Sequence, residues 1–251
     1  MPDRSVTVLT PVGPRWDPRY LRVARDVLDL NDTVLEWVVV CDGSDPDRVR
    51  DAVGADPRIR VLGSVVNRGT AHARNAGLAQ ASGEWIYAFD ADDVPLAGGV
   101  DLLVAAAQAQ SAVWSAGLAY DVAADGETVV YKPPVELAPF HTTIPVGGFL
   151  AQADRTGVYP VLCSGATLLS TEVARRAGGW DEFLRTVSED VSLIAWISER
   201  HAGAWCDDYV MAYRKHPASM TATGHGEVAE AVAARRVRRR ARVDGPGAAG
   251  R

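Results

Sequence analysis

Residues 67–93 read NRGTAHARNAGLAQASGEWIYAFDADD and place a helix, a stop and a strand in immediate succession. The alanine-rich part predicts a helix over residues 70–81, because alanine has the highest helix propensity. A Ser-Gly pair ends that helix, and the apolar run at 85–89 predicts a buried strand. Three carboxylates follow this strand directly, on Asp90, Asp92 and Asp93. Like charges crowded at a strand end indicate either a solvated turn or a site for a cation.

The rest of the N-terminal half repeats this alternation of strands and helices. Apolar runs predict strands over residues 5–10, 35–41, 58–62 and 112–119, and periodic patterns predict helices over 18–30, 46–53 and 98–110. The strand LEWVVVC is apolar almost throughout, which is typical of a parallel strand buried on both faces. We therefore expect the α/β class, with an open, mostly parallel sheet flanked by helices in a single domain.

The C-terminal half begins with an irregular, proline-rich stretch from residue 120 to 159, with a hairpin-like turn at 124–126. Strands are predicted again over 166–169 and 208–213, and helices over 170–177 and 189–199. Neither a linker nor an internal repeat separates this half from the first. We expect one domain over residues 1–226, with halves 1–119 and 120–226.

The net charge of −6 conceals an asymmetry between the body and the end of the chain. Residues 227–251 contain seven arginines and three acidic residues, so this segment carries +4 and the body carries −10. An acidic body lacks the basic face that nucleic-acid binding requires. The basic tail has helical spacing, which predicts a solvated helix or, alternatively, contact with an anionic membrane or a partner.

Targeting signals are absent from the chain as given. The first residues lack the long apolar core of a signal peptide, and no run approaches the roughly 20 apolar residues that span a bilayer. The three cysteines are scattered, which indicates reduced thiols and no zinc cluster. We expect a cytoplasmic protein; the alternative is a protein that binds peripherally at the inner face of a membrane.

Ligands of a parallel α/β sheet gather at the carboxyl ends of its strands. This rule selects Thr10 and Pro11 after the first predicted strand, Asp42 after the second, and the acids from Asp90 onward. Hard carboxylate oxygens favour Mn²⁺ or Mg²⁺, and magnesium keeps coordination positions for phosphate oxygens. Each feature also has a structural interpretation: a polar turn for the acids and an Asx turn for Asp42. Arg74, on the predicted helix, could reach a diphosphate or be a surface cation.

Taken in order, the segments resemble a known family. The segments are TPVG at 10–13, VVVCDGSDPD at 38–47, the stretch at 67–93, GGWDEF at 178–183, SEDVSL at 188–193 and YRKHPASMT at 213–221. They look like the successive blocks of family 2 glycosyltransferases with the GT-A fold. The resemblance covers roughly residues 5–221, and its central block is highly specific. It implies transfer of a sugar from a nucleotide-sugar, expected to carry UDP, to an acceptor hydroxyl with inversion at the anomeric carbon.

The resemblance also implies roles on the donor side, in the half 1–119. Asp42 would contact the base, Arg74 would lie near the donor pocket, and Thr10, Pro11, Asp90 and Ala91 would line it. Asp92 would ligate Mn²⁺ or Mg²⁺, with Asp90 as a second and water-mediated ligand. His216 matches a position that supplies a further metal ligand or phosphate contact in some members; its alternative is a structural histidine.

On the acceptor side, in the half 120–226, the resemblance makes Asp190 the general base and Glu189 its nearest rival. The alternative is a helix start, in which Ser188 is the N-cap and two acids favour the helix dipole. Trp180 and Asp181 match a segment near the acceptor, where the indole could stack on a sugar or pack in the core. Residues 132–160 are expected to shape the acceptor site, for a small-molecule, glycan or lipid-linked acceptor.

One departure concerns the base pocket. The family pattern after the first strand is Pro-x-Tyr-Asn, whereas this chain has Pro-Val-Gly-Pro-Arg over residues 11–15. Gly13 has no side chain to stack, so Arg15 or Trp16 would have to compensate.

Two other functions stay open: a non-catalytic homologue that binds a nucleotide or partner, and a nucleotidyltransferase. The second requires a glycine-rich, lysine-containing phosphate loop, which TPVGPR does not provide.

Overall fold

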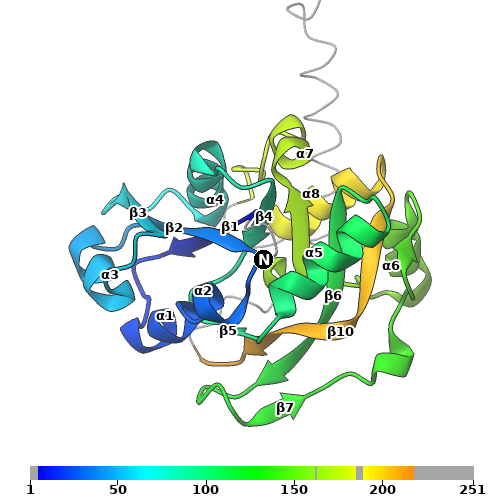
Figure 1. Cartoon of the computed structure of the whole chain (residues 1–251), viewed down its shortest axis with the longest axis horizontal. Helices are drawn as coiled ribbons and strands as arrows, with labels where there is room; N and C mark the ends of the chain where they lie inside the picture. Colours follow the sequence, from blue (N-terminus) through cyan, green and yellow to red (C-terminus); the bar gives the residue numbers. More distant parts are fainter. Residues whose placement is uncertain (1–4, 162, 185–188, 218–251) are drawn as a thin grey trace, which may run out of the picture.

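The computed structural model describes residues 5–161, 163–184 and 189–217, and these residues build one sheet with helices on both sides (Figure 1). The strands are β1 Val6–Val12, β2 Val34–Asp42, β3 Ile59–Ser64, β4 Trp85–Ala88, β5 Val94–Pro95, β6 Trp114–Val122, β7 Val129–Tyr131, β8 Thr143–Ile144, β9 Thr167–Ser170 and β10 Gly203–Arg214. The α-helices are α1 Pro18–Ala24, α2 Val27–Leu30, α3 Pro46–Val53, α4 Thr70–Gln80, α5 Gly99–Ala109, α6 Gly148–Thr156, α7 Thr171–Arg176 and α8 Glu189–Ser198, with 3₁₀ turns η1 Val135–Leu137 and η2 Ser164–Ala166.

The order of strands across the sheet is β3-β2-β1-β4-β9-β6-β10-β5, with β7 beside β6 and β8 beside β10. Strands β3, β2, β1 and β4 are all parallel, and β6 is parallel to β10. Strand β9 is antiparallel to both β4 and β6, so β1, β2, β3, β4, β6 and β10 all run the same way. The mostly parallel sheet expected from the apolar strands is therefore confirmed.

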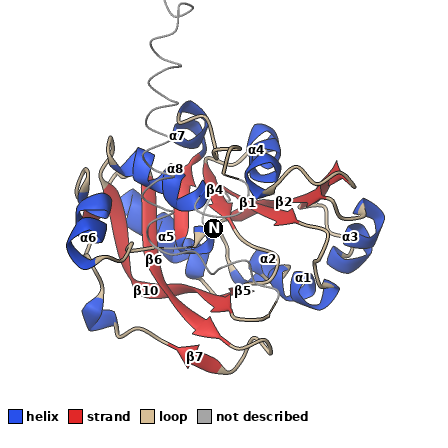
Figure 2. Ribbon diagram, turned by 180° about the vertical axis from the view of Figure 1, so that it is seen from behind, coloured by secondary structure: helices blue, strands red, loops and turns tan. Residues whose placement is uncertain are grey.

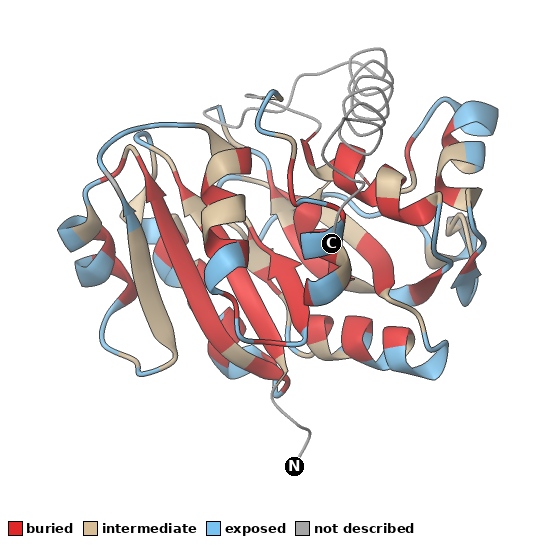
Figure 3. Ribbon diagram, turned by 90° about the horizontal axis from the view of Figure 1, so that it is seen from above, coloured by how far each residue is buried: buried red, intermediate tan, exposed pale blue. Residues whose placement is uncertain are grey.

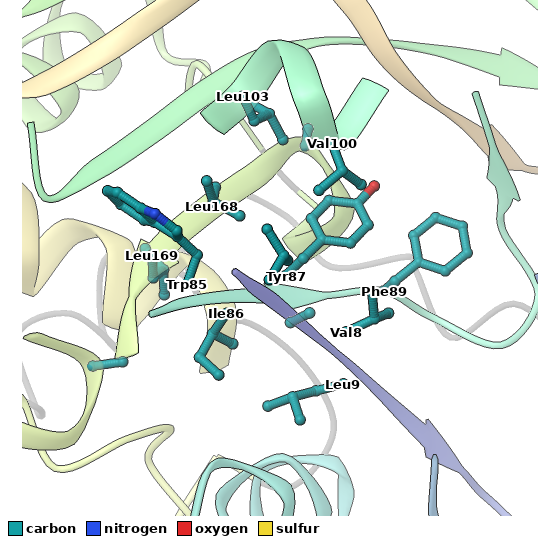
Figure 4. Packing of buried hydrophobic residues seen from close by; sticks show 14 of the residues in the cluster. Val8, Leu9, Trp85, Ile86, Tyr87, Phe89, Val100, Leu103, Leu168 and Leu169 are labelled. Atoms are coloured by element: carbon teal, nitrogen blue, oxygen red, sulfur yellow. The ribbon is translucent and has the colours of Figure 1, made fainter. Parts of the chain in front are cut away.

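The core lies on both faces of this sheet. Every residue of β2 except one is buried, as its nearly continuous apolar sequence predicts. On β4, Trp85, Ile86 and Tyr87 are nearly inaccessible, and they pack among residues of β1, β9 and α5 (Figure 4). Buried residues follow the strands and the inner faces of the helices, while the outer faces of the helices are exposed (Figure 3). Helix α5 lies on the side of the sheet that faces the viewer in Figure 1, and α8 lies on the opposite side (Figure 2).

Helix starts follow local sequence signals. Asp17 and Asp45 precede α1 and α3, and each carboxylate accepts a hydrogen bond from a backbone amide two residues later. A proline at the first position of each helix loses no hydrogen bond, because the first amides of a helix lack internal partners. These caps fix where the connections after β1 and β2 turn away from the sheet edge.

The predicted helix over residues 18–30 is two helices. The amides of Asp26, Leu28 and Asp29 each bond to the carbonyl three residues back instead of four, which tightens the chain and separates α1 from α2. In the predicted irregular stretch, α6 is a finding that the sequence did not indicate. Only Phe149 and Ala153 of this helix are buried, so its apolar periodicity is short.

The last strand is longer than predicted. Residues 208–213 were expected to be a strand, and β10 begins five residues earlier at Gly203. The register against β6 shifts between Cys206 and Tyr209, which exposes Asp207 and Asp208. Such a bulge adds residues to one strand, and its charged pair masks the strand pattern in the sequence. The turn predicted at 124–126 does connect two antiparallel strands, β6 and β7.

The basic tail at 227–251 and Ser188 lie outside the described residues. Within the described part, no helix has both the length and the apolar content needed to cross a bilayer.

Candidate functional site

The predicted site residues come together at one edge of the sheet. Because β1, β2, β4, β6 and β10 run the same way, the residues that follow them emerge at a common edge. Asp42 ends β2, Asp92 follows β4, and His216 follows β10. Glu189 and Asp190 reach the same edge as the first residues of α8.

His216 and Asp92 face each other directly. The Nε2 atom of His216 lies 2.8 Å from Oδ2 of Asp92, although 124 residues separate them. The imidazole is 9% exposed and the carboxylate 39% exposed, so the pair opens toward solvent from the side of Asp92. The ring of Tyr20 on α1 lies behind the imidazole, with 5.2 Å between ring centroids. The imidazole is therefore held between an aromatic ring and a carboxylate.

Arg74 is the centre of a second cluster. Its guanidinium lies 2.6 Å from Asp90, 2.7 Å from Glu189 and 3.3 Å from Asp190. The side chain is 2% exposed, so these carboxyl groups replace the water that a surface arginine would have. Burial disfavours its charge, but the three acids outweigh this cost and raise the Arg74 pKa. The cluster joins the end of β4 to the start of α8.

The two acids of α8 have opposite protonation tendencies. Burial, reinforced by the adjacent Asp190, raises the pKa of Glu189 to about 8. Burial would also raise the pKa of Asp190, but Arg74 and a hydrogen bond from Ser164 lower it below its ordinary value. Oγ of Ser164 lies 2.5 Å from Oδ2 of Asp190. At neutral pH, Asp190 is thus an ionised acceptor beside a protonated Glu189.

The three acids after β4 have three different environments. Asp90 faces Arg74, and its pKa is raised by burial and by the charges of Asp92 and Asp190. Asp93 is 1% exposed and accepts a hydrogen bond from the backbone amide of Arg214 at 3.1 Å. Burial, with Asp90 and Asp92 close by, raises the pKa of Asp93 well above its usual range. Asp92 is therefore the acid with the most accessible carboxylate for a ligand.

Asp42 holds the segment that leads into α4. Its two carboxylate oxygens accept hydrogen bonds from the amides of Arg68 at 2.5 Å and Gly69 at 2.9 Å. The residue is 5% exposed. These partners lie 26 and 27 residues later in the chain, so the contacts are not the local Asx turn of the alternative interpretation, and contact with a nucleobase stays a prediction.

The other expected donor residues differ in how far they reach the site. Thr10 lies inside β1, is fully buried, and accepts a hydrogen bond of 2.8 Å from the indole of Trp37. Its hydroxyl is used within the core, and contact with the donor stays a prediction. Pro11 is in β1 as well and is partly exposed. Ala91 lies partly buried in the loop between Asp90 and Asp92.

Burial bears on two further expectations. Trp180 is 3% exposed, which favours the alternative of a core residue, and stacking on a sugar stays a prediction. The backbone carbonyl of Trp180 accepts a hydrogen bond from the side-chain amide of Asn75, and its backbone N–H donates one to the oxygen of the same amide. These two bonds fix the 178–183 segment against α4. Arg74 is enclosed by carboxyl groups instead of reaching outward to a diphosphate. Asp181 lies near the surface, where it accepts a hydrogen bond from the amide of Phe183.

Sequence reasoning missed three residues of the site. Ser164, on η2, contacts Asp190. Tyr20, on α1, contacts His216. Arg214, on β10, contacts Asp92. No spacing in the sequence connects these pairs, because each contact arises from the crossing of distant elements. Arg214 lies within the quoted YRKH block, which was the only available signal.

The donor atoms suit a divalent cation that is completed by substrate. Among the described residues, no group of three His, Cys, Asp or Glu side chains could hold a metal by itself. Asp92 and His216 supply one carboxylate oxygen and one imidazole nitrogen. Mg²⁺ sites in enzymes commonly use one or two carboxylates, with phosphate oxygens and water in the other positions. The carboxylate of Asp92 therefore fits such an ion, whereas an imidazole ligand is more typical of a transition metal, and two side chains do not make a closed structural site.

A family model covers part of this site. Residues 17–178 match the model described as glycosyl transferase family 2, which is more than half of the chain. The chain belongs to glycosyl transferase family 2. The matched residues of this family 2 glycosyltransferase include Asp42, Arg74 and Asp92, whereas Asp190 and His216 lie beyond them.

Solved structures share the fold of this family 2 glycosyltransferase. Residues 1–349 of S. aureus TarS in complex with UDP superpose with a TM-score of 0.64 at 17% identity, covering 92% of this chain and 65% of TarS. The same TarS segment in a second crystal structure gives 0.60 at 18% identity, covering 84% and 60%. The succinoglycan biosynthesis protein ExoO of Rhizobium meliloti (strain 1021) is 45% identical over 58 residues, 22% of this chain and 17% of ExoO. The chain thus spans less than two thirds of each of these relatives.

Proposed function

We propose that the chain is a metal-dependent, inverting glycosyltransferase that moves a sugar from a nucleotide diphosphate sugar to an acceptor hydroxyl. One observation carries this proposal: the guanidinium of Arg74 contacts both Asp190 at the start of α8 and Asp90 on the loop that bears Asp92, and the pKa of Asp190 is lowered while that of Glu189 is raised. A base for the acceptor and a site for the donor thereby share one edge of the sheet.

On the donor side, Asp92 and His216 would hold Mn²⁺ or Mg²⁺ together with the diphosphate. A cation bound there would neutralise charge that builds on the leaving group as the glycosidic bond breaks. The TarS structure contains UDP, which supports UDP as the nucleotide of this chain as well. Asp42, at the end of β2, is the candidate contact for the base.

On the acceptor side, Asp190 takes the proton of the attacking hydroxyl. The acceptor oxygen forms its bond to the anomeric carbon as the bond to the diphosphate breaks on the opposite face, which inverts the configuration. General-base assistance of this kind contributes roughly 10²–10⁴ to the rate. The hydroxyl of Ser164 and the guanidinium of Arg74 keep Asp190 ionised and oriented for this role.

Glu189 and Arg74 act through their neighbours. A protonated Glu189 cannot serve as the base at neutral pH, which favours Asp190 over its rival. Arg74 connects the two halves of the reaction, because the same guanidinium contacts Asp90 and Asp190. Displacement of either acid would therefore disturb the other.

A screen of nucleotide-sugars tests the proposal. The full chain is incubated with UDP-, GDP- and TDP-sugars, with Mn²⁺, with Mg²⁺ and with EDTA, and release of the nucleoside diphosphate is measured. We expect release from at least one UDP-sugar that depends on the added metal, and a product whose anomeric configuration is opposite to that of the donor when an acceptor is supplied. Tight nucleotide binding without hydrolysis or transfer under any condition would contradict catalysis and favour a binding protein.

A further inference from the structure

Arg214, the last residue of β10, lies directly behind the Asp92–His216 pair. The residue is 2% exposed. Its Nε donates a hydrogen bond of 2.6 Å to the backbone carbonyl of Asp92, and its amide donates to the buried carboxyl of Asp93 at 3.1 Å. Two consecutive residues of the acidic loop are therefore held by one arginine.

The same guanidinium reaches two other elements. Nη1 donates a hydrogen bond of 3.0 Å to the carbonyl of Ala124, in the turn between β6 and β7. The guanidinium carbon also lies 4.4 Å from the ring centroid of Tyr20, within the range of a cation–π contact. Tyr20 in turn packs against the imidazole of His216. Arg214 thus supports both proposed metal ligands: it holds Asp92 through the backbone of that residue and His216 through the ring of Tyr20.

The turn after β6 is shaped around this side chain. Gly126 has φ +82°, and a Cβ atom added there would lie 2.4 Å from Nη1 of Arg214. The carboxylate of Asp125 accepts hydrogen bonds of 2.9 Å from the amides of Glu127 and Thr128, which keeps the turn closed. The close approach leaves Arg214 little room to adopt another rotamer.

A buried arginine is expensive to maintain, since removing a guanidinium from water costs several kcal/mol unless it is fully paired. An apolar residue at the end of β10 would fill the same space in the core without the desolvation free energy of a guanidinium. The contacts of Arg214 are instead directed at the residues around one ligand pair. Groups that orient metal ligands in this way typically change metal affinity by 10–100-fold when they are replaced.

We propose that Arg214 is a positioning residue, which fixes Asp92 and, through Tyr20, His216 so that both can bind the cation that carries the donor diphosphate. The inference rests on the proposed function, because it takes Asp92 and His216 as the metal-binding pair. It adds the β6–β7 turn to the donor site as a part whose position sets the affinity for metal.

The test uses the full-length Arg214→Lys variant, with UDP as the probe in titration calorimetry. Lysine keeps the charge, but its single ammonium cannot reproduce the two separated donors of the guanidinium fork. We expect the affinity for UDP in the presence of Mn²⁺ to fall by about 10–100-fold, with the affinity in EDTA unchanged. Wild-type Mn²⁺ dependence in Arg214→Lys would overturn the inference.

Arg175→Lys is the matched control. Arg175, on α7, also donates to backbone carbonyls, those of Leu78 and Ala81 at the C-terminal end of α4. Because Arg175 is exposed, we expect this variant to lose less thermal stability than Arg214→Lys and to keep the Mn²⁺ dependence of UDP binding. An equal loss of Mn²⁺ dependence in both variants would assign the effect to general destabilisation and contradict the inference.

Two further variants separate the possible failures. If Arg214→Lys does not fold, Tyr20→Leu decides, because it removes the ring behind His216 and leaves the buried charges in place. A several-fold weaker Mn²⁺-dependent affinity for UDP supports the inference, and an unchanged one overturns it. If Asp92→Asn keeps wild-type Mn²⁺ dependence, the proposed metal pair is wrong and the inference falls with it. If Asp92→Asn loses this dependence and Arg214→Lys does not, only the role of Arg214 is wrong.

Discussion

Asp190 accepts a hydrogen bond of 2.5 Å from the hydroxyl of Ser164, which lies 26 residues earlier on η2. This contact and the guanidinium of Arg74 lower the pKa of Asp190 despite its burial. The neighbouring Glu189 lacks the serine contact, and its pKa is about 8. One hydroxyl therefore helps to decide which of two adjacent acids is ionised.

Replacing Ser164 by alanine is predicted to raise the pKa of Asp190. Hydrogen bonds to charged groups are worth about 1.5–3 kcal/mol, so the loss should shift the acidic limb of the kcat/KM profile to higher pH by about one to two pH units. The pH profile of sugar transfer measures this. Ser198→Ala is the control, because Ser198 is a buried serine that donates to Ala195 away from the acids. An unshifted profile in Ser164→Ala would contradict the coupling.

The two acids of α8 are predicted to respond differently to amide substitution. Asp190→Asn removes the ionised base and should reduce kcat by roughly 10²–10⁴ with the affinity for UDP retained. Glu189→Gln replaces a neutral acid by a neutral amide and should cost far less. Single-turnover rates and UDP affinities for both variants decide the assignment, with Asp154→Asn on the exposed side of α6 as a control. A collapse of UDP affinity in Asp190→Asn would show that this residue acts on the donor instead.

Glu189 is also predicted to make stability depend on pH. Its pKa is about 8 in the folded protein and about 4.3 in an unfolded chain. Between these values the folded state holds a proton that the unfolded state has lost, so the free energy of unfolding falls as pH rises, by up to about 1.4 kcal/mol per pH unit. Urea denaturation of the wild type and Glu189→Gln across this window measures the effect. The variant should gain stability relative to the wild type as pH increases, and a constant difference would refute the assigned protonation.

The Asp92–His216 pair is predicted to carry the metal dependence of nucleotide binding. Asp92→Asn should abolish the effect of Mn²⁺ on UDP affinity while the circular dichroism spectrum stays native, because the carboxylate is partly exposed and outside the core. His216→Ala should weaken the same dependence. His141→Ala is the matched control, since His141 is 93% exposed. Full Mn²⁺ dependence in Asp92→Asn would disprove this account of the site.

Trp180 is predicted to act on stability and not on the acceptor. Trp180→Ala should lower the free energy of unfolding by about 3–5 kcal/mol, the usual cost of removing a buried aromatic side chain. Trp180→Phe should fold and keep the KM for the acceptor. Trp114→Phe, at a fully buried position in β6, is expected to behave alike. A selective rise of acceptor KM in Trp180→Phe would restore the sugar-stacking interpretation.

Much of the fold could be predicted because its signals are local. The burial of β2 follows from its apolar sequence, and the starts of α1 and α3 follow from an Asp-Pro pair at each N-terminus. The failures lie where periodicity is short or interrupted. Helix α6 buries only two residues, and the Asp207–Asp208 pair interrupts the pattern of β10.

The residues of the site likewise fall into those with a local signal in the sequence and those without one. Since parallel strands end at one edge, the strand pattern in the sequence predicts that Asp42 and Asp92 lie at a common edge, and the family resemblance added Asp190 and His216. The surroundings of each group there depend on how distant elements pack. This packing encloses Arg74 among three acids, buries Trp180 and turns Thr10 into the core. Protonation depends on burial and on charges that are distant in sequence, such as Arg74 and Glu189 at a separation of 115 residues, and no local pattern encodes such a distance.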